Sequence, residues 1–275
     1  MSSRPIVFAS CLIAALTASP TPGEPPKPKD GPLGMKFVPL PKGTFYMGWN
    51  GKKGSAKKTE IKEDFEIAVH PVTQGQWEAV MGKNPSYFSR AEDGKKAVID
   101  IKDEELKDFP VETVRWSECQ EFIEKLNEKG KGYVYRLPSE VEWEYACRGG
   151  ATSEEECSYQ FYLTKPTNDL SSKDANFDGR SPFGKGEMGP YLGRTTKVGS
   201  YAPNKVGLYD MHGNVGQWCS DLSDPNNPIP VRRGSSWFFN GSDCLTATRR
   251  VPDPRARGNG IGFRLVRVAS APVGK

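Results

Sequence analysis

The sequence contains few of the residues that commonly hold transition metals or act as general bases. It has two histidines, His70 and His212, which lie far apart along the 275-residue chain. Two histidines cannot supply the histidine-rich ligand set that is typical of non-haem iron. The six cysteines include no Cys-x-x-Cys pair, so neither a zinc ribbon nor a thioredoxin-like redox site is indicated. The sequence also shows no arrangement of a nucleophile, a base and an orienting acid that indicates a triad hydrolase.

A strong excess of charge of one sign is absent as well. The 38 basic and 34 acidic residues leave a formal net charge of +4. Acids such as Glu60 interrupt the lysines between positions 52 and 62, which indicates a solvated loop and no nucleic-acid partner. Arginines near the C-terminus are better candidates for a surface that faces an anion, although they could instead pair with local acids such as Asp243. These arginines are Arg249, Arg250, Arg255, Arg257, Arg264 and Arg267.

The apolar stretch near the N-terminus, residues 6–16, is shorter than the roughly 20 residues of a membrane span. It follows Arg4 and precedes small residues, a pattern typical of an export signal over residues 1–19. The proline-rich residues 20–34 predict a stiff, extended linker, which leaves residues 35–270 for one domain without a transmembrane segment. Export would place the chain in a periplasm or outside the cell, where disulfides can form.

The content of 29 glycines and 23 prolines predicts a loop-rich fold with few regular elements. Alternating apolar residues at 43–47 and 65–69 predict half-buried strands, and the run 261–268 predicts a strand that closes a sheet. Residues 149–230 show little periodicity. A loop tract of this length inside a compact domain tends to be functional or held by ions.

Three helices are predicted from capping-box patterns that begin at Thr73, Ser117 and Ser139. In such a box a hydroxyl and an acid or amide satisfy each other's backbone donors at the start of a helix. The apolar residues that follow have helical spacing. Cys119 and Cys147 fall on the apolar faces of the second and third helices, which favours a core role over a reactive one.

Nine segments, in order, resemble the landmarks of the formylglycine-generating enzyme, or sulfatase-modifying factor, family. The resemblance runs from about residue 35 to residue 269. It implies an irregular α+β domain similar to C-type lectins, with few regular elements and bound calcium. The segments are 43–48, 71–77, 84–87, 109–112, 136–146, 175–179, 207–219, 233–237 and 260–264.

Active members of that family oxidise a sulfatase cysteine to formylglycine, using oxygen and copper held by two cysteines. The resemblance places the second copper cysteine at Cys244 and the active-site serine at Ser236. The first copper cysteine falls on Phe239, which cannot ligate copper(I). A tryptophan of the same pocket falls on Gly216. The resemblance therefore implies a degenerate copper site, and copper is not expected.

Two calcium sites are also implied by the resemblance. One would use Asn176 and the carbonyl of Phe177, and the other would use Asp210, the carbonyl of Gly213 and Gln217. Calcium needs several oxygen ligands, and glutamine in place of the family's glutamate removes a charge from the second site. Alternatively, these residues stabilise tight turns without any metal.

Cys244 has two interpretations once its copper partner is missing. It could form a disulfide with Cys219 that ties the two C-terminal segments together. It could also be a reactive thiolate, for which Arg249 or Arg250 would have to supply a positive field. We expect the disulfide.

The sequence leaves three functions open. The first is an exported, non-catalytic protein whose lectin-like pocket binds a protein, peptide or glycan, with a sulfatase among the candidate partners. Trp237, Phe239, Arg249 and Arg250 would form this pocket, because recognition surfaces favour aromatics and arginine. The second is a formylglycine-generating oxidase in which Cys219 supplies the missing thiol. The third is an accessory subunit of a catalytic relative.

Overall fold

The computed structural model describes residues 25–129, 132–223, 229–253 and 255–270. The export signal expected at residues 1–19 lies outside this part of the chain. No helix in the described residues is long and apolar enough to cross a membrane.

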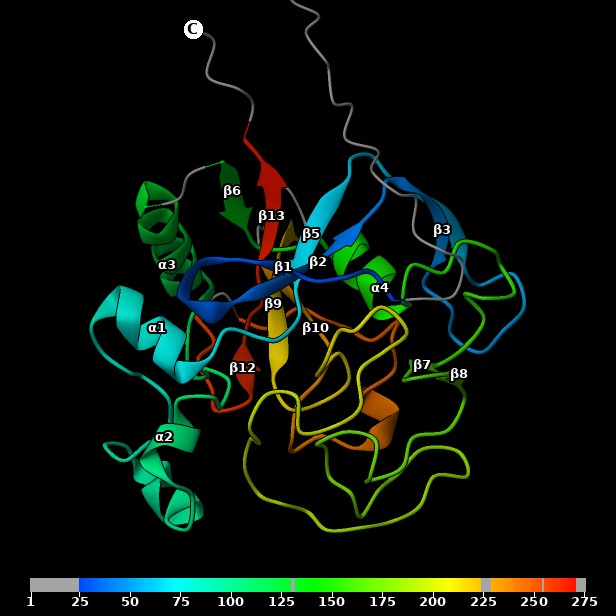
Figure 1. Ribbon diagram of the computed structural model, residues 1–275. Helices are drawn as coiled ribbons and strands as arrows, with labels where there is room; N and C mark the ends of the chain where they lie inside the picture. Colours follow the sequence, from blue (N-terminus) through cyan, green and yellow to red (C-terminus); the bar gives the residue numbers. More distant parts are fainter. Residues whose placement is uncertain (1–24, 130–131, 224–228, 254, 271–275) are drawn as a thin grey trace, which may run out of the picture.

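A five-stranded antiparallel sheet brings the two ends of the described chain together (Figure 1). Its C-terminal strand, residues 266–269, is hydrogen-bonded between two others. The single strand predicted over residues 261–268 is therefore only partly right, because residues 261–262 pair with a strand of the second sheet. The predicted strand at residues 65–69 is also confirmed. In spatial order the strands are β1 (Lys29–Asp30), β2 (Lys36–Leu40), β5 (Phe65–Ala68), β13 (Val266–Ala269) and β6 (Tyr133–Arg136).

The N-terminal edge of this sheet differs from the extended linker expected over residues 20–34. Strand β1 pairs antiparallel with β2, and a short 3-10 turn, η1 (Pro32–Gly34), connects them. Arg267 donates to the carbonyl of Asp30 at 2.9 Å and lies 4.2 Å above the ring of Phe37. The end of the proline-rich segment therefore belongs to the domain, because pairing satisfies backbone groups that a free linker would leave to water.

The three predicted helices are present, and two of their three capping boxes are confirmed. Both Thr73 and Ser139 accept a hydrogen bond from the backbone amide three residues ahead, and that residue's side chain accepts one in return. The box at Ser117 is wrong, because the helix starts at Trp116, two residues before the start that a cap at Ser117 would give. Glu118 accepts from the backbone amide of Arg115 at 2.7 Å instead. The helices are α1 (Gln74–Met81), α3 (Trp116–Lys129) and α4 (Glu140–Cys147).

A second sheet, of four strands, carries the segments that the candidate site uses. Strand β10 runs antiparallel to β9 and β11, whereas β12 runs parallel to β9. The order is β11 (Arg249–Arg250), β10 (Pro230–Arg233), β9 (Gly216–Leu222) and β12 (Ile261–Gly262).

Smaller elements complete the fold. Two hairpins flank the sheets, and the strand predicted at residues 43–47 is one arm of the first. One short helix and two further 3-10 turns were not predicted. The hairpins are β3 (Gly43–Met47) with β4 (Lys57–Ile61), and β7 (Phe161–Tyr162) with β8 (Pro166–Thr167). The remaining elements are α2 (Asp103–Leu106), η2 (Asp93–Val98) and η3 (Gly241–Asp243).

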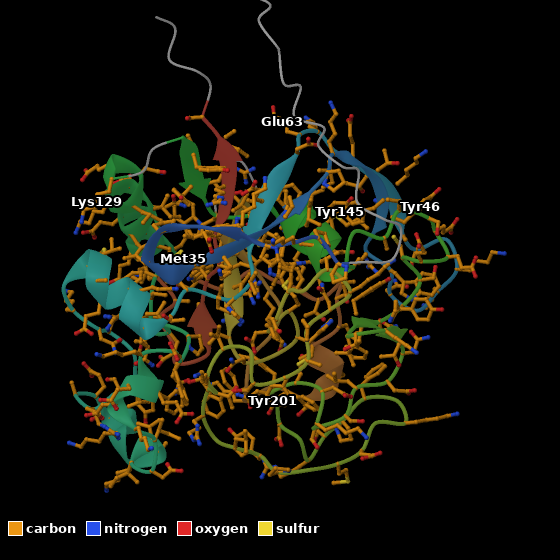
Figure 2. All side chains as sticks on the ribbon, viewed as in Figure 1. Met35, Tyr46, Glu63, Lys129, Tyr145 and Tyr201 are labelled. Carbon is orange, nitrogen blue, oxygen red and sulfur yellow. The ribbon has the colours of Figure 1, made fainter. Side chains whose placement is uncertain are left out.

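Most of the chain between β8 and β9 forms turns and loops, as the missing periodicity predicted. This tract, which includes Tyr201, lies below the five-stranded sheet in the figures and carries many inward side chains (Figures 1 and 2). Asn204 holds part of it against the end of α4. Its Nδ2 donates to the carbonyls of Ala146 and Cys147, and its Oδ1 accepts from two amides of its own loop. The side-chain amide of Asn204 thus anchors this part of the tract without an ion.

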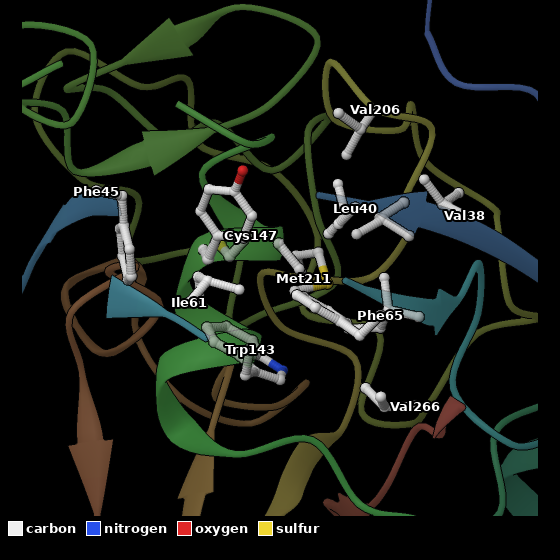
Figure 3. Packing of buried hydrophobic residues seen from close by; sticks show 14 of the residues in the cluster. Val38, Leu40, Phe45, Ile61, Phe65, Trp143, Cys147, Val206, Met211 and Val266 are labelled. Carbon is white, nitrogen blue, oxygen red and sulfur yellow. The ribbon is translucent and has the colours of Figure 1, made fainter. Parts of the chain in front are cut away.

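Two hydrophobic clusters form the main core. In the first, Trp143 and Cys147 of α4 pack with Phe65 and Met211 (Figure 3). The second surrounds α3 and includes Cys119. Both Cys119 and Cys147 have no exposed surface, which confirms their predicted core role.

A buried carboxylate on α4, that of Glu144, connects elements that are far apart in sequence. It pairs with Arg148 on its own helix at 2.6 Å and with Arg233 of β10. It also accepts from the amide of Gly48, just after β3, at 2.7 Å. Arg148 in turn donates to the hydroxyl of Tyr162 in β7 at 2.8 Å. One carboxylate therefore organises the packing of α4, β3, β7 and β10.

Replacing Glu144 by glutamine keeps its size and removes its charge. Arg148 loses its counter-ion, and Arg233 keeps only Glu140, at 3.8 Å. We expect the free energy of unfolding to fall by about 3–5 kcal/mol, because an uncompensated charge stays buried. Urea denaturation measures this change. The control is Glu187→Gln, which removes an exposed pair with Lys173 and should change stability by less than about 0.5 kcal/mol. Equal losses in the two variants would contradict the central role of Glu144.

Candidate functional site

Neighbouring residues of β10 and β11 send their side chains to opposite faces of the sheet, as strand geometry requires. On one face, Arg233 and Arg249 both pair with Glu140, at 3.8 and 2.8 Å. Arg232 and Arg250 are opposite each other in the same register and share the other face. Arg249, expected in the ligand pocket, therefore points toward α4 and away from Arg250.

Four aromatic rings lie in contact on the face of Arg250, and we call them the aromatic strip: Tyr191, Trp237, Phe238 and Phe239. Successive ring centroids are 5.7, 5.1 and 4.3 Å apart. Arginine guanidinium groups cover both ends, with Arg250 4.1 Å above Phe239 and Arg180 4.5 Å above Tyr191. Cation–π contacts of this kind hold rings in a fixed orientation. The structure thus brings three of the expected pocket residues together, namely Trp237, Phe239 and Arg250.

Exposure differs along the strip. Trp237 is 8% exposed, donates its indole N–H to the carbonyl of Asn259 at 2.9 Å and packs edge-on against Phe88. Phe238 and Tyr191 are 39% and 37% exposed. Trp237 therefore anchors the strip, and Phe238 and Tyr191 offer the accessible surface.

Sequence reasoning did not identify Arg180 and Tyr191 as site residues. Both belong to the loop tract, where no periodicity or motif indicates which side chains point to the same place. Arg180 is oriented by two hydrogen bonds to the carboxylate of Asp178, at 2.8 Å each. The amide of Asp178 donates to the carbonyl of Phe239 at 2.8 Å, which attaches this loop to the strip.

Cys244 and Ser236 are both fully buried beside the strip. The thiol of Cys244 lies 3.6 Å from the carbonyl of Asn240, and burial raises its pKa to about 12. The hydroxyl of Ser236 has no hydrogen-bond partner among the described residues. The same part of the chain contains no group of three or more His, Cys, Asp or Glu side chains placed to hold a metal ion.

The disulfide expected between Cys219 and Cys244 is not formed. Both thiols are free. Cys219 packs in the first core cluster with Trp143, whereas Cys244 packs in a different cluster with Phe161 and Phe177. Their neighbours differ because Cys219 lies on β9 and Cys244 follows the turn η3.

His212 holds the loop segments around Cys244 together, as the sequence indicated. Its Nδ1 lies 2.8 Å from the carbonyl of Cys244, and its Nε2 lies 3.0 Å from the backbone amide of Tyr162. The amide donates to Nε2, so Nδ1 carries the proton and donates to the carbonyl. Burial lowers the pKa of His212 to about 4, which keeps the imidazole neutral at physiological pH.

The residues of the first implied calcium site leave an oxygen unused. Asn176 is 2% exposed and donates through Nδ2 to Arg194 and Asn214, but its Oδ1 accepts no hydrogen bond from the described residues. Phe177 follows directly in the chain. An unsatisfied buried oxygen fits a cation or a bound water.

The second implied calcium site has a different chemistry. The side-chain oxygen of Gln217 accepts from Trp143 at 2.8 Å and from the buried guanidinium of Arg264 at 2.6 Å. Its nitrogen donates to the carbonyl of Asp210 at 2.8 Å. A Cβ on Gly213 would lie 2.3 Å from the carbonyl oxygen of Asn176, so glycine is needed there for space. This set of hydrogen bonds, with a cationic side chain already in it, does not fit calcium.

The chain belongs to the family of sulfatase-modifying factor enzyme 1-like domains, whose model matches residues 24–269. This match confirms the family resemblance drawn from the ordered motifs. It leaves the activity open, because similar proteins include both a formylglycine-generating enzyme and one that is named inactive.

Among curated relatives, the chaperone protein LppX of Paenibacillus barcinonensis is 29% identical over 78% of this chain and 84% of its own length. Inactive C-alpha-formylglycine-generating enzyme 2 of Bos taurus is 24% identical, over 88% and 91%. A formylglycine-generating enzyme of Mus musculus is 26% identical, over 85% and 75%. The match to serine/threonine-protein kinase pkn1 of Chlamydia pneumoniae, 27% identical, spans only 40% of that protein.

Two solved structures show the same fold. Treponema denticola variable protein 1 superposes with a TM-score of 0.66 at 24% identity, covering 87% of this chain and 98% of that one. PvdO from Pseudomonas aeruginosa gives 0.62 at 25% identity, covering 89% and 98%. The irregular, loop-rich α+β fold similar to C-type lectins is therefore confirmed.

The pKa of His212 predicts acid sensitivity. The unfolded chain takes up the histidine proton near pH 6.5 and the folded chain only near pH 4, so protonation favours unfolding. The contribution of His212 to the free energy of unfolding is fully present above pH 6.5. It is lost as the pH falls toward 4, and the total loss is about 3 kcal/mol. Free energies of unfolding at pH 7 and pH 4.5 measure it.

The matched variant is His212→Gln. Its side-chain amide can still donate to the carbonyl of Cys244 and accept from the backbone amide of Tyr162. We expect it to be less stable than the parent at pH 7 but to lose less stability at pH 4.5. Burial also lowers the pKa of His70 to about 4. His70 should therefore destabilise the parent and the variant equally as the pH falls. An unchanged pH dependence in the variant would contradict this role of His212.

Proposed function

We propose that this chain is a non-catalytic binding member of its family and that the aromatic strip with Arg250 is its ligand contact. The observation that carries the proposal is the pairing of Phe239 with Arg250, at 4.1 Å, where the resemblance implies the first copper cysteine. A ring covered by a guanidinium offers contact area and positive charge in place of a metal ligand.

The state of Cys244 supports the same conclusion. Copper(I) prefers thiolates, and a two-coordinate site needs two of them. Cys244 is the sulfur that remains in this segment, and burial holds it in the thiol form at neutral pH. Cys219 packs in another cluster and does not replace the missing partner. The donor set does not fit copper, and no oxidation step is derived through it.

The strip has the properties of a recognition surface. Its centre is a buried tryptophan, its flanks are exposed aromatic rings, and arginines border both ends. Aromatic residues and arginine dominate the energetics of protein interfaces, with a buried anchor surrounded by contacts that exclude water. The ligand is a protein, peptide or glycan, and a sulfatase is a candidate partner because relatives carry the name of a sulfatase-modifying activity.

The second candidate function is the oxidation of a sulfatase cysteine to formylglycine. Family membership favours it, since a mouse relative bears that activity's name. A bovine relative that is named inactive supports the non-catalytic alternative.

Restoring the missing sulfur separates the two functions. We expect the parent chain to show no specific copper(I) binding and no oxygen-dependent conversion of a peptide with the sequence Cys-x-Pro-x-Arg. Phe239→Cys should bind one copper(I), because it supplies a second thiolate beside Cys244, and the double variant with Cys244→Ser should not. Competition with a chromogenic copper(I) chelator and mass spectrometry of the peptide are the measurements. Tight copper binding and peptide conversion by the parent would establish the oxidase instead.

We also propose that one of the two implied calcium sites persists, at Asn176 and the carbonyl of Phe177. The unused Oδ1 of Asn176 supports it, while the contact between Gln217 and Arg264 speaks against the second site. Calcium titration by calorimetry should give one equivalent, and Asn176→Ala should lose it. Two equivalents, or none, would refute this assignment.

Export to a periplasm or to the outside of the cell is the localisation we propose, on the pattern of residues 1–19. Fusing residues 1–34 to a reporter that is active only after export tests it, and Ile6→Arg in the apolar stretch is the control.

A further inference from the structure

Gly216 leaves room that another side chain occupies. The family resemblance places a tryptophan at this position, but a Cβ on Gly216 would lie 2.8 Å from both Cδ and Nε of Arg232. The two residues sit on adjacent strands, β9 and β10. The glycine is therefore required by the arginine: any larger residue would displace the guanidinium from the interior.

Arg232 is buried, and no ion pair joins it to an acid in the described part of the chain. Its exposed fraction is 7%, and its Nε has no hydrogen-bond partner among the described residues. The Nε atoms of Arg233 and Arg250 also lack a partner among the described residues, but the neighbouring arginines differ from Arg232 in forming ion pairs. Arg233 pairs with Glu144, Arg249 pairs with Glu140, and Arg250 pairs with Asp243.

The electrostatic surroundings make this charge costly. Burial, and then the positive charge of Arg250 across the strand pair, lower the pKa of Arg232 to about 10. At neutral pH the guanidinium still carries its charge. A buried charge without a partner is strongly destabilising, and natural proteins keep such groups where they have a function. One positive charge is thus left uncompensated at this place.

The uncompensated charge lies next to the aromatic strip. The amide of Gly216 donates to the carbonyl of Gly260 at 2.8 Å. A Cβ on Gly260 would lie 2.4 Å from Phe238 and 2.7 Å from the hydroxyl of Ser236, which itself lacks a partner among the described residues. An unpaired cation and an unpaired hydroxyl donor therefore flank one pair of glycines, and an exposed ring borders them.

We propose that Arg232, with Arg250 and the hydroxyl of Ser236, binds a carboxylate of a peptide ligand whose apolar part lies on the aromatic strip. This inference rests on the binding function proposed above and names the chemistry that the site selects. A carboxylate matches the single uncompensated charge and accepts two parallel hydrogen bonds from a guanidinium. The Ser236 hydroxyl can donate to the same group. The ring of Phe238 provides contact for an aromatic or aliphatic side chain beside the carboxylate.

The probes for the test are acetate, N-acetylphenylalanine and its uncharged twin N-acetylphenylalaninamide. At equal ionic strength in chloride, 100 mM acetate should raise the melting temperature of the parent chain by about 3 °C. N-acetylphenylalanine should bind at least tenfold more tightly than its amide, as measured by calorimetry. Sulfate at the same ionic strength should have a smaller effect than acetate.

Arg232→Gln should lose the acetate response and the preference for the acid over the amide. It should also raise the melting temperature in chloride, because it removes an uncompensated buried charge. Gly216→Ala, which crowds Arg232 through a single methyl group, should weaken the acetate response as well. The matched control is Arg249→Gln on the opposite face of the same strand pair, which should lower stability but keep the acetate response.

The outcomes separate this inference from the function on which it rests. An acetate response that Arg232→Gln retains, equal binding of acid and amide, or a stronger response to sulfate would overturn the carboxylate site. Phe238→Ala should reduce the affinity for N-acetylphenylalanine and leave the acetate response unchanged. If that variant binds N-acetylphenylalanine as the parent does, the strip is not the ligand contact and the proposed function fails, even where the acetate response persists.

Discussion

The ion pairs of Glu144 are the interaction on which the arrangement of the candidate site depends. This carboxylate, with no exposed surface, binds Arg148 on α4 and Arg233 on β10. Because a separated charge in the interior is costly, the three groups stay together in one geometry. Arg233 is thereby held on the α4 side of its sheet, and strand alternation then turns Arg232 to the side of the aromatic strip. The buried ion pair between Glu144 and Arg233 thus determines that Arg232 lies on the side of the aromatic strip.

Three positions change the chemistry of this region together. Phe239 provides a ring where the resemblance implies a sulfur, Gly216 removes an indole, and Arg232 occupies the space beside it. Each change alone would damage a copper site. Combined, they form an aromatic and cationic surface over a buried thiol, Cys244, whose pKa is about 12. This surface is the basis of the binding function proposed above, because the fold alone does not determine the activity.

Features that depend on near neighbours in the chain were predicted well. The helix starts at Thr73 and Ser139 were read correctly, since a capping box involves residues three positions apart. Cys119 was placed in the core by helical spacing. Ser117 was misassigned because Glu118 accepts a hydrogen bond from the amide of Arg115, and the helix starts two residues before the start that a cap at Ser117 would give. The disulfide of Cys219 and Cys244 was wrong because burial in separate clusters is a property of the packed chain.

By itself the sequence determined the family and the loop-rich α+β fold, because ordered motifs need no coordinates. Only the tertiary structure decided which side chains meet. It joined Tyr191 from the loop tract to Trp237, and it turned Arg249 away from Arg250. It also buried Arg232, whose Nε has no hydrogen-bond partner in the described part of the chain. These are contacts between segments far apart in the chain, and their geometry follows from burial and pairing that no local pattern records.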